Sequence, residues 1–387
     1  MRQEAEQFNK SLKSDKAGFT PLVPLETIRH GGLTGLEKAA PTSAFAGKCG
    51  IRESGFSRGS LTGFTLVELL TVMSVILILM SLLVPALNSM RIHAYYVKQK
   101  NQFHGMDVAI EFFNTERDGY PDSSEFDKNG GTPYCGAMKL AEAMVGQDSL
   151  GFNPQSKFYQ IGTYDGGAPN GGIPSGGTGV VPLGNDLYPG RRVPSVSIDI
   201  IKASIKERKE LYLPLENSNA YRLGDLYDAT IVNNIFGSGA ATLPVLCDVY
   251  IKVVHRTTGK NVGMPVLYYK ADTRKNSHDF SLQTLSLMKN HQATQNIYNF
   301  MDNDTLVRCG IPTEVQPVAH PMESGLSGAL TYDLQPPDPA LFYKETWNEN
   351  MQNIAGYRPY KADSYILMSA GFDGIYGTKD DVFNFEK

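Results

Sequence analysis

The chain has 387 residues, with 36 Lys and Arg against 40 Asp and Glu, a formal net charge of −4 and 41% apolar residues. This composition excludes a wholly disordered chain, and no segment has the basic density that a nucleic-acid-binding protein needs for its phosphate contacts. Four Cys in this length exclude a disulfide-rich scaffold, and no Cys pair is spaced as CxxC, so a structural zinc site is not expected.

The first element expected along the chain is a long apolar helix. The 22 residues from Leu69 to Met90 carry no charge, and about 20 such residues cross the hydrocarbon core of a bilayer as a helix. The alternatives are a buried helix of a soluble domain and the apolar core of a secretory signal. A buried helix rarely stays uncharged on every face for six turns, and Val84–Asn88 continues a helical pattern instead of forming a small-x-small cleavage site. The sequence therefore favours one transmembrane segment.

A specific motif, Gly63–Leu70 (GFTLVELL), stands at the start of this run. Its Glu68 is a lone carboxylate at the edge of a membrane helix, where an unpaired charge is costly and requires a partner. Taken alone, Glu68 could equally mark the membrane interface. The whole string in front of an uncharged helix resembles the cleavage and methylation motif of type IV prepilins and type II secretion pseudopilins.

The resemblance implies a role for four positions. A prepilin peptidase would cut the Gly63–Phe64 bond and N-methylate Phe64. Glu68 would neutralise the new amine of a neighbouring subunit, and because both charges are expensive alone and tolerable as a pair, the pair would set the register of helical assembly. Pro85 matches the family's proline near the end of the apolar run. It has no N–H to donate to the Ser81 carbonyl, so a kinked or loosened helix is expected there.

Residues 1–63 would then be a cleaved leader, mostly disordered. This leader is longer than is usual in the family and contains no second Met, which leaves open a mis-called start codon or non-standard initiation. Basic residues lie on both sides of the apolar run, so the positive-inside rule gives little contrast. The resemblance implies a single-pass protein of the bacterial inner membrane with its C-terminal domain in the periplasm.

The helix is expected to continue from the transmembrane half, residues 64–88, into an amphipathic half that ends in a turn, residues 89–121. One stripe at helical spacing runs along the second half, with charged residues elsewhere on the helix and Gln99 as its one polar member. The stripe consists of Ile92, Tyr96, Gln99, Phe103, Met106, Ile110 and Phe113. It predicts a helix from Phe64 to about Asn114 that packs on a sheet. The Asn-x-x-x-Asp-Gly-Tyr-Pro string that follows also resembles the major pseudopilins.

Residues 122–387 are expected to form the extracytoplasmic domain. Helices are predicted at 137–145, 194–213 and 281–298, an antiparallel hairpin from 246–254 and 264–270 with a turn at 257–261, and a last strand at 365–369. The stretch 162–190 holds ten Gly and four Pro, which predicts either a surface loop without a role or a lineage-specific contact surface. The expected fold class is α+β and pilin-like: a long N-terminal helix on a small antiparallel sheet, with large loop and helix insertions.

An acidic loop, residues 369–382, is predicted near the C-terminus. Asp373, Asp380 and Asp381 lie within nine residues with two Gly between them, and such a loop can wrap oxygens around a calcium ion. It lacks the EF-hand pattern, and a plain polar turn is the alternative. The string resembles the C-terminal calcium loop of type II secretion major pseudopilins. That resemblance implies that the three Asp are side-chain ligands and that backbone carbonyls complete the shell.

No catalytic residue is proposed from the sequence. Within residues 64–387 no His lies in HExxH and no Ser lies in GxSxG. The expected function is that of a pseudopilin-like subunit, processed by prepilin peptidase and assembled with other copies on an inner-membrane platform. The filament would belong to a type II secretion or type IV pilus-like system. The alternative is a single-pass membrane-anchored extracytoplasmic binding protein or enzyme that does not polymerise.

Overall fold

The computed structural model divides the chain into two units, residues 1–65 and 66–387. The described part of the first unit, Gly63–Thr65, has no regular secondary structure. The expected leader therefore lies almost entirely outside the described residues. These residues are 63–126, 132–160, 186–192, 196–237, 239–276, 278, 296–311, 320–322, 338–353 and 356–387.

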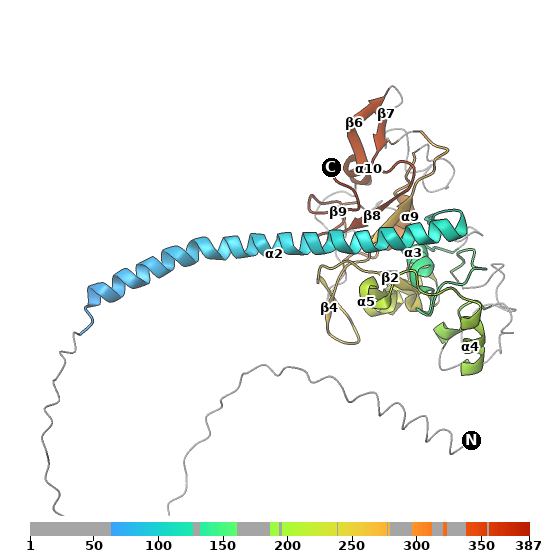
Figure 1. Ribbon diagram of the computed structural model, residues 1–387, viewed down its shortest axis with the longest axis horizontal. Coiled ribbons are helices and arrows are strands. Elements are labelled where there is room, and N and C mark those ends of the chain that lie inside the picture. The colour runs from blue at the N-terminus through green and yellow to red at the C-terminus, as the bar shows by residue number, and fades with distance from the viewer. Residues whose placement is uncertain are drawn as a thin grey trace, which may run out of the picture. The chain divides into compact units, whose positions relative to one another are not determined.

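The second unit is α+β, with one long helix, several short helices and small antiparallel sheets (Figure 1). The helices are α2 (Leu66–Arg117), α3 (Gly136–Val145), α4 (Ile198–Lys206), α5 (Leu215–Ser218), α6 (Leu223–Leu226), α7 (Ala229–Phe236), α9 (Met301–Val307), α10 (Ala340–Thr346) and the 3-10 turns η2 (Pro189–Arg192) and η3 (Ala240–Thr242). The strands are β1 (Ala220–Arg222), β2 (Pro244–Leu246), β3 (Val253–Val254), β4 (Asn261–Val262), β5 (Leu267–Lys270), β6 (Trp347–Asn353), β7 (Gly356–Pro359), β8 (Tyr365–Ser369) and β9 (Val382–Phe383). The expected general class is confirmed at this level.

Helix α2 has 52 residues, which corresponds to about 78 Å, and it runs without a break through Pro85. Its bounds agree with the predicted helix to within three residues. The predicted stripe is buried from Gln99 onward, but Ile92 and Tyr96 are 38% and 40% exposed. The stripe therefore packs on the domain over a shorter length than expected, because α2 leaves the domain before Gln99.

The packed half of α2 covers one face of the β5–β8–β9 sheet. Along β8 the side chains alternate between two buried clusters: Tyr365 and Leu367 join the cluster that contains α2 and α3, whereas Ile366 and Met368 join the cluster on the other face. Every residue of β8 is buried, as expected for a central strand covered on both faces. The predicted strand at 365–369 is confirmed.

Gln99 is the polar member of the stripe, and its burial has a clear reason. Its Oε1 accepts a hydrogen bond from the backbone N–H of Val249, at 2.9 Å. A buried backbone donor without a partner costs free energy, so Gln99 ties the segment after β2 to α2.

The predicted hairpin of 246–254 and 264–270 is present only in part. The two segments run antiparallel at an isolated bridge between Cys247 and Pro265. Nearer the turn, β3 pairs antiparallel with β4, which precedes the second predicted segment. Strand β5 pairs with β8 instead of with 246–254. The expected antiparallel hairpin is therefore present, but its pairing is interrupted and its second segment also pairs with β8.

Asp248 explains the interruption. This residue is 2% exposed, and its Oδ1 accepts the backbone N–H groups of Tyr250 and Met264, both at 3.1 Å. Its Oδ2 accepts the hydroxyl of Ser369 at 2.8 Å. A side chain that satisfies these donors replaces the ladder hydrogen bonds that a continuous hairpin would make.

The stability of the domain should depend on the proton of Asp248. Burial raises the pKa of its carboxyl from 3.8 to about 8. The folded chain therefore holds a proton that the unfolded chain loses above about pH 4. This contribution is complete below about pH 4 and is lost as the pH rises towards 8, by at most ~1.4 kcal/mol per pH unit.

In Asp248→Asn, Oδ1 still accepts the two backbone N–H groups and Nδ2 donates to the Ser369 hydroxyl oxygen, as a protonated Oδ2 would. The variant should therefore flatten that part of the profile and be more stable than the parent chain at about pH 8. Thermal unfolding midpoints of both chains in detergent, between about pH 5 and pH 8, check this. If the unfolding midpoints of the parent chain and of Asp248→Asn fall by the same amount between these pH values, the proton of Asp248 does not set the pH dependence.

The predicted helix at 194–213 is shorter than expected. Helix α4 covers Ile198–Lys206 and buries none of its side chains. Beyond it, the N–H of Lys209 donates to the Phe152 carbonyl and the N–H of Tyr212 to the Met144 carbonyl. Because these N–H groups bond to distant carbonyls, they are not available for helical hydrogen bonds, and the helix ends before them. The predicted helix at 137–145 is confirmed as α3.

Two further predictions fall largely on residues that the structure does not describe. The predicted helix at 281–298 lies outside the described residues except for 296–298, which are not helical. The glycine-rich stretch 162–190 lies outside them up to residue 185, and its described end leads into η2.

Candidate functional site

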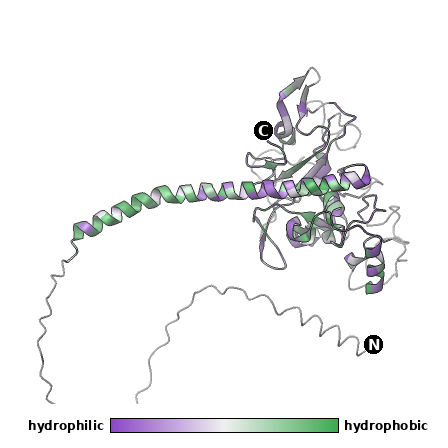
Figure 2. Cartoon of the chain, viewed as in Figure 1, coloured by the Kyte–Doolittle hydropathy of each residue, from purple (hydrophilic) through white to green (hydrophobic). Residues whose placement is uncertain are grey.

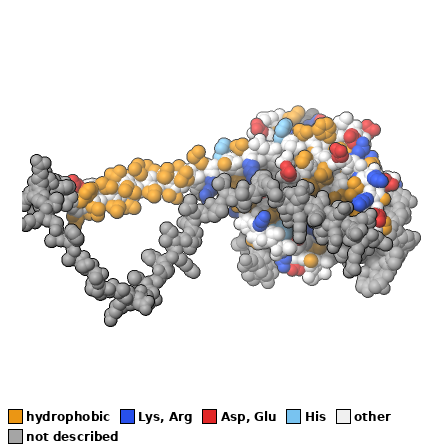
Figure 3. All heavy atoms as spheres, turned by 60° about the horizontal axis from the view of Figure 1, so that its bottom comes forward, with side chains coloured by type: hydrophobic (Ala, Val, Ile, Leu, Met, Phe, Trp, Pro, Cys, Tyr) orange, Lys and Arg blue, Asp and Glu red, His pale blue; other side chains and the backbone are white. Residues whose placement is uncertain are grey.

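The first half of α2 presents an apolar surface on all sides. No residue from Leu66 to Met90 is buried. The ribbon of this half is mostly green, for hydrophobic residues, in Figure 2, and its apolar side chains, orange in Figure 3, cover the visible face. The hydroxyls of Thr71, Ser74 and Ser81 donate to carbonyls three residues earlier in the same helix, at 2.7–2.9 Å. Such local bonds make hydroxyl side chains compatible with an apolar environment.

Helix α2 is the one helix among the described residues that is long and apolar enough to cross a membrane. This observation is compatible with single-pass anchoring near the N-terminus, which is the coarse part of the predicted location. None of the apolar window is buried inside the domain, so the helix differs from the core helix of a soluble protein.

The motif residues lie at the beginning of α2. Gly63 and Phe64 precede the helix and are exposed, Phe64 to 77%. No atom of the described chain lies within 4 Å of the point where a Cβ on Gly63 would stand. Glu68 lies in the first turn of α2, where the helix dipole favours an acidic side chain. Pro85 lies inside the helix, within the apolar half.

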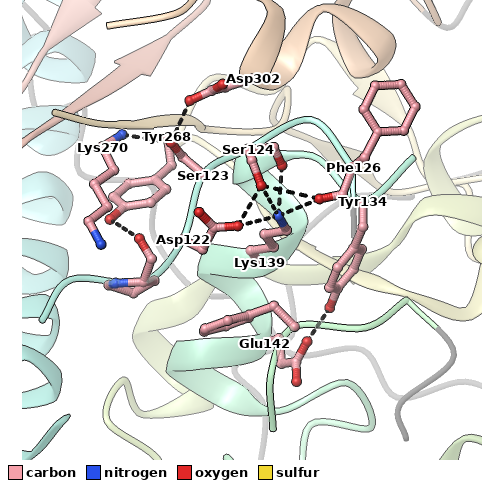
Figure 4. A network of polar contacts seen from close by, with 12 residues as sticks. Asp122, Ser123, Ser124, Phe126, Tyr134, Lys139, Glu142, Tyr268, Lys270 and Asp302 are labelled. Atoms are coloured by element: carbon pink, nitrogen blue, oxygen red, sulfur yellow. Dashed lines mark hydrogen bonds and ion pairs between the residues drawn. The ribbon is translucent and has the colours of Figure 1, made fainter. Parts of the chain in front are cut away.

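A buried polar network fixes the segment after α2 to α3, and sequence reasoning missed it (Figure 4). The Lys139 side chain is 1% exposed and contacts Asp122 Oδ2 at 2.5 Å. Its ammonium also donates to Ser124 Oγ at 2.7 Å and to the carbonyls of Ser124 and Phe126, both at 2.8 Å. Four oxygens therefore surround one buried cation, as its desolvation requires.

A second buried charge, Glu142, lies one turn further along α3. It accepts the hydroxyl of Tyr134 at 2.5 Å and that of Tyr188 at 2.9 Å. Burial, and then the nearby Glu142, raises the pKa of both phenols well above the usual value. The sequence held one signal of these networks: Lys139 and Glu142 are charged residues in an otherwise apolar predicted helix, and buried charges require partners.

The carboxylates of Asp380 and Asp381 close the C-terminal loop by accepting hydrogen bonds from its backbone. Asp380 Oδ2 accepts the backbone N–H of Asp373 at 2.9 Å. Asp381 Oδ2 accepts the N–H groups of Gly377 and Thr378 at 2.8 and 3.1 Å. These bonds close the loop between β8 and β9. Among the residues that the structure describes, no three His, Cys, Asp or Glu side chains are grouped as they would be around a metal ion.

The pKa values of the three carboxyls in this loop are shifted in different directions. Burial raises the pKa of Asp381 well above its usual value, and Asp381 Oδ1 is buried without a hydrogen-bond partner. Burial, with Asp380 close by, also raises the pKa of Asp373. The pKa of Asp380 is lowered, because hydrogen bonds from Thr378 and Asp373 outweigh the opposing effect of burial. The loop thus holds a buried acceptor oxygen that a cation could use.

The chain end beyond this loop is attached to α2. The Lys100 ammonium donates to the carbonyls of Phe383 and Phe385 at 2.9 and 2.8 Å. Asp107 Oδ1 accepts the Asn384 amide at 2.9 Å and the Tyr365 hydroxyl at 2.8 Å. The position of the acidic loop is therefore linked to that of the helix.

Comparison with family models, with curated proteins and with solved structures found no match for this chain.

Proposed function

We propose that this chain is a pseudopilin-like subunit that prepilin peptidase cuts after Gly63 and that assembles through α2 into a filament. The observation that carries the proposal is the Gly63–Leu70 motif, whose Glu68 lies in the first turn of a helix with an entirely exposed apolar half. The filament would form in the periplasm from the bacterial inner membrane, on an assembly platform, as in type II secretion or type IV pilus-like systems. The role is mechanical and requires no catalytic residue.

The apolar half of α2 can be covered by lipid in the membrane and by protein in the filament. The apolar half is covered by acyl chains while the subunit is in the membrane, and neighbouring α2 helices would cover it in the filament. The amine created at Phe64 would lie beside Glu68 of a neighbour, which neutralises two charges that are costly alone.

The first measurement is the mass of the N-terminal peptide of the chain from membranes of the native host. A chain that begins at N-methylated Phe64 is the expected result. A chain that retains residues 1–63 would contradict the proposal and leave a membrane-anchored protein that does not polymerise.

We also propose that the C-terminal loop binds calcium. The buried Asp381 Oδ1 without a partner, in the same loop as Asp373 and Asp380, supports this. Asp373, Asp380 and Asp381 would hold the ion with backbone carbonyls. When bound, it would supply positive charge to three adjacent carboxylates and order the loop between β8 and β9.

Calcium should raise the thermal unfolding midpoint of the detergent-solubilised chain. A free concentration of about 100 times Kd adds ~2.7 kcal/mol to the stability of a folded chain that binds one ion. Asp381→Asn should remove this shift, whereas Asp338→Asn, at a surface ion pair remote in sequence, should keep it. Equal midpoints in millimolar calcium and in chelator would refute the site.

A further inference from the structure

The end of the domain from which the apolar half of α2 emerges lies at the level of the lipid headgroups when α2 spans a membrane. The uncharged run from Leu69 to Met90 extends about 33 Å, which is enough to cross a hydrocarbon core of about 30 Å, and the headgroup layers add about 5–7 Å on each side. Tyr95 follows Met90 by about 8 Å along the helix. Because helical side chains lean toward the N-terminus, Tyr95 and Tyr96 lean toward the membrane.

Ring contacts with α2 place a second segment of the domain at the same level. The rings of Tyr95 and Tyr250 pack with their centroids 5.9 Å apart. The Tyr250 ring also contacts that of Phe372 in the acidic loop, with centroids 6.5 Å apart. Ile251 and Lys252 follow directly, and both are exposed, Ile251 to 52%. We call this surface the membrane-facing end of the domain; it comprises residues 91–98, 250–252 and 372.

The membrane-facing end has the composition of an interfacial anchor. Tyr96 is 40% exposed, and Ile251 adds exposed apolar surface. The Lys252 ammonium lies over the ring of Phe372, 4.4 Å from its centroid. Aromatic rings, and lysines whose apolar stems lie along other apolar groups, are favoured at the headgroup level. An exposed isoleucine there gains free energy when lipid replaces the water around it.

The charges of this end favour anionic lipid. Arg91, Lys98 and Lys252 are exposed, and none of them takes part in an ion pair within the described part of the chain. Figure 3 shows blue and pale blue side chains on the helix just beyond its orange half. The carboxylates of Asp373 and Asp380 lie in the adjacent acidic loop, but both accept hydrogen bonds within that loop, which partly offsets their charge.

We propose that the membrane-facing end binds anionic phospholipid headgroups of the leaflet from which the domain emerges. Tyr96, Ile251 and Phe372 enter the headgroup layer, and Lys98 and Lys252 contact lipid phosphates. The inference rests on the membrane-anchored part of the proposed function and adds a second membrane contact, made by the folded domain. This contact holds the domain against the leaflet for as long as α2 remains in the bilayer.

Fluorescence quenching in vesicles tests the contact. The chain contains one Trp, Trp347, so in a Trp347→Phe background Ile251→Trp is the single reporter. The full chain is reconstituted into vesicles of phosphatidylcholine and phosphatidylglycerol that carry a quencher on a lipid headgroup. Ile251→Trp should lose most of its emission. Ile205→Trp replaces another exposed isoleucine, on α4 near the opposite end of the domain (Figure 1), and should keep its emission.

A second comparison tests the charges. Lys98→Gln combined with Lys252→Gln should reduce the quenching of Ile251→Trp to the level found in vesicles of phosphatidylcholine alone. Added salt should have the same effect, because it screens the attraction between lysines and anionic lipid. The control, Lys202→Gln combined with Lys206→Gln, removes the same charge from α4 and should leave the quenching unchanged.

The failures can be distinguished because insertion of α2 is measured separately, by resistance to extraction with alkaline carbonate. An inserted chain in which Ile251→Trp is quenched no more than Ile205→Trp would overturn the headgroup contact and leave the anchor in place. Equal quenching with and without phosphatidylglycerol would overturn the recognition of anionic lipid. A chain that carbonate extracts would overturn both the anchor and the contact.

Discussion

Glu68→Ala is expected to prevent filament assembly while leaving membrane insertion intact or improved. Removing the carboxylate leaves the amine of the neighbouring Phe64 without its partner in apolar surroundings, and an uncompensated charge there costs ~2.5–3.5 kcal/mol. Filament yield should therefore fall at least about tenfold. Quantitative immunoblotting of sheared filaments and of membrane fractions separates assembly from insertion.

The matched control is Ser74→Ala, in the same half of α2. The Ser74 hydroxyl bonds only to its own helix at the Thr71 carbonyl, so assembly should persist. Filaments or secretion that survive Glu68→Ala unaltered would argue for a membrane anchor that does not polymerise.

Lys139→Met is expected to produce the largest loss of domain stability among single changes in the polar networks. Methionine keeps most of the side-chain volume but removes the ammonium, so Asp122 loses its ion-pair partner and the carbonyls of Ser124 and Phe126 lose their charged donor. The Asp122 side chain is half-exposed, so the main loss is the charged donor of the oxygens around Lys139, which costs ~1–3 kcal/mol. Thermal unfolding of the detergent-solubilised chain measures the loss.

Lys202→Met serves as the control for the loss of a lysine charge. Lys202 is exposed on α4, and surface changes of this kind alter stability by no more than about 0.5 kcal/mol. A similar small effect at Lys139 would mean that the oxygens around it find other donors.

Local sequence patterns predicted those helices and strands whose burial follows one regular pattern along their length. The bounds of α2 follow from an uncharged run and a helical stripe, and β8 follows from five consecutive residues that are all buried. Where a single residue sets the structure through distant partners, the patterns failed. Asp248 reads as a polar interruption of a strand, but its hydrogen bonds to Met264 and Ser369 can be seen only once the fold brings them together.

The features of the candidate site also differ in whether the sequence could predict them. The motif at Gly63–Leu70 and the three loop carboxylates are contiguous in sequence, so both could be identified before the structure was known. The group of oxygens around Lys139, in contrast, joins residues of a loop to a residue of a helix. Periodicity in one segment carries no information about such pairings.

The attachment of the chain end to α2 has a practical consequence for labelling. Because Lys100 holds the carbonyls of Phe383 and Phe385, a fluorescent protein or affinity tag fused after Lys387 would begin close to the part of α2 that emerges from the apolar half. Its bulk would compete for space with the bilayer or with neighbouring subunits.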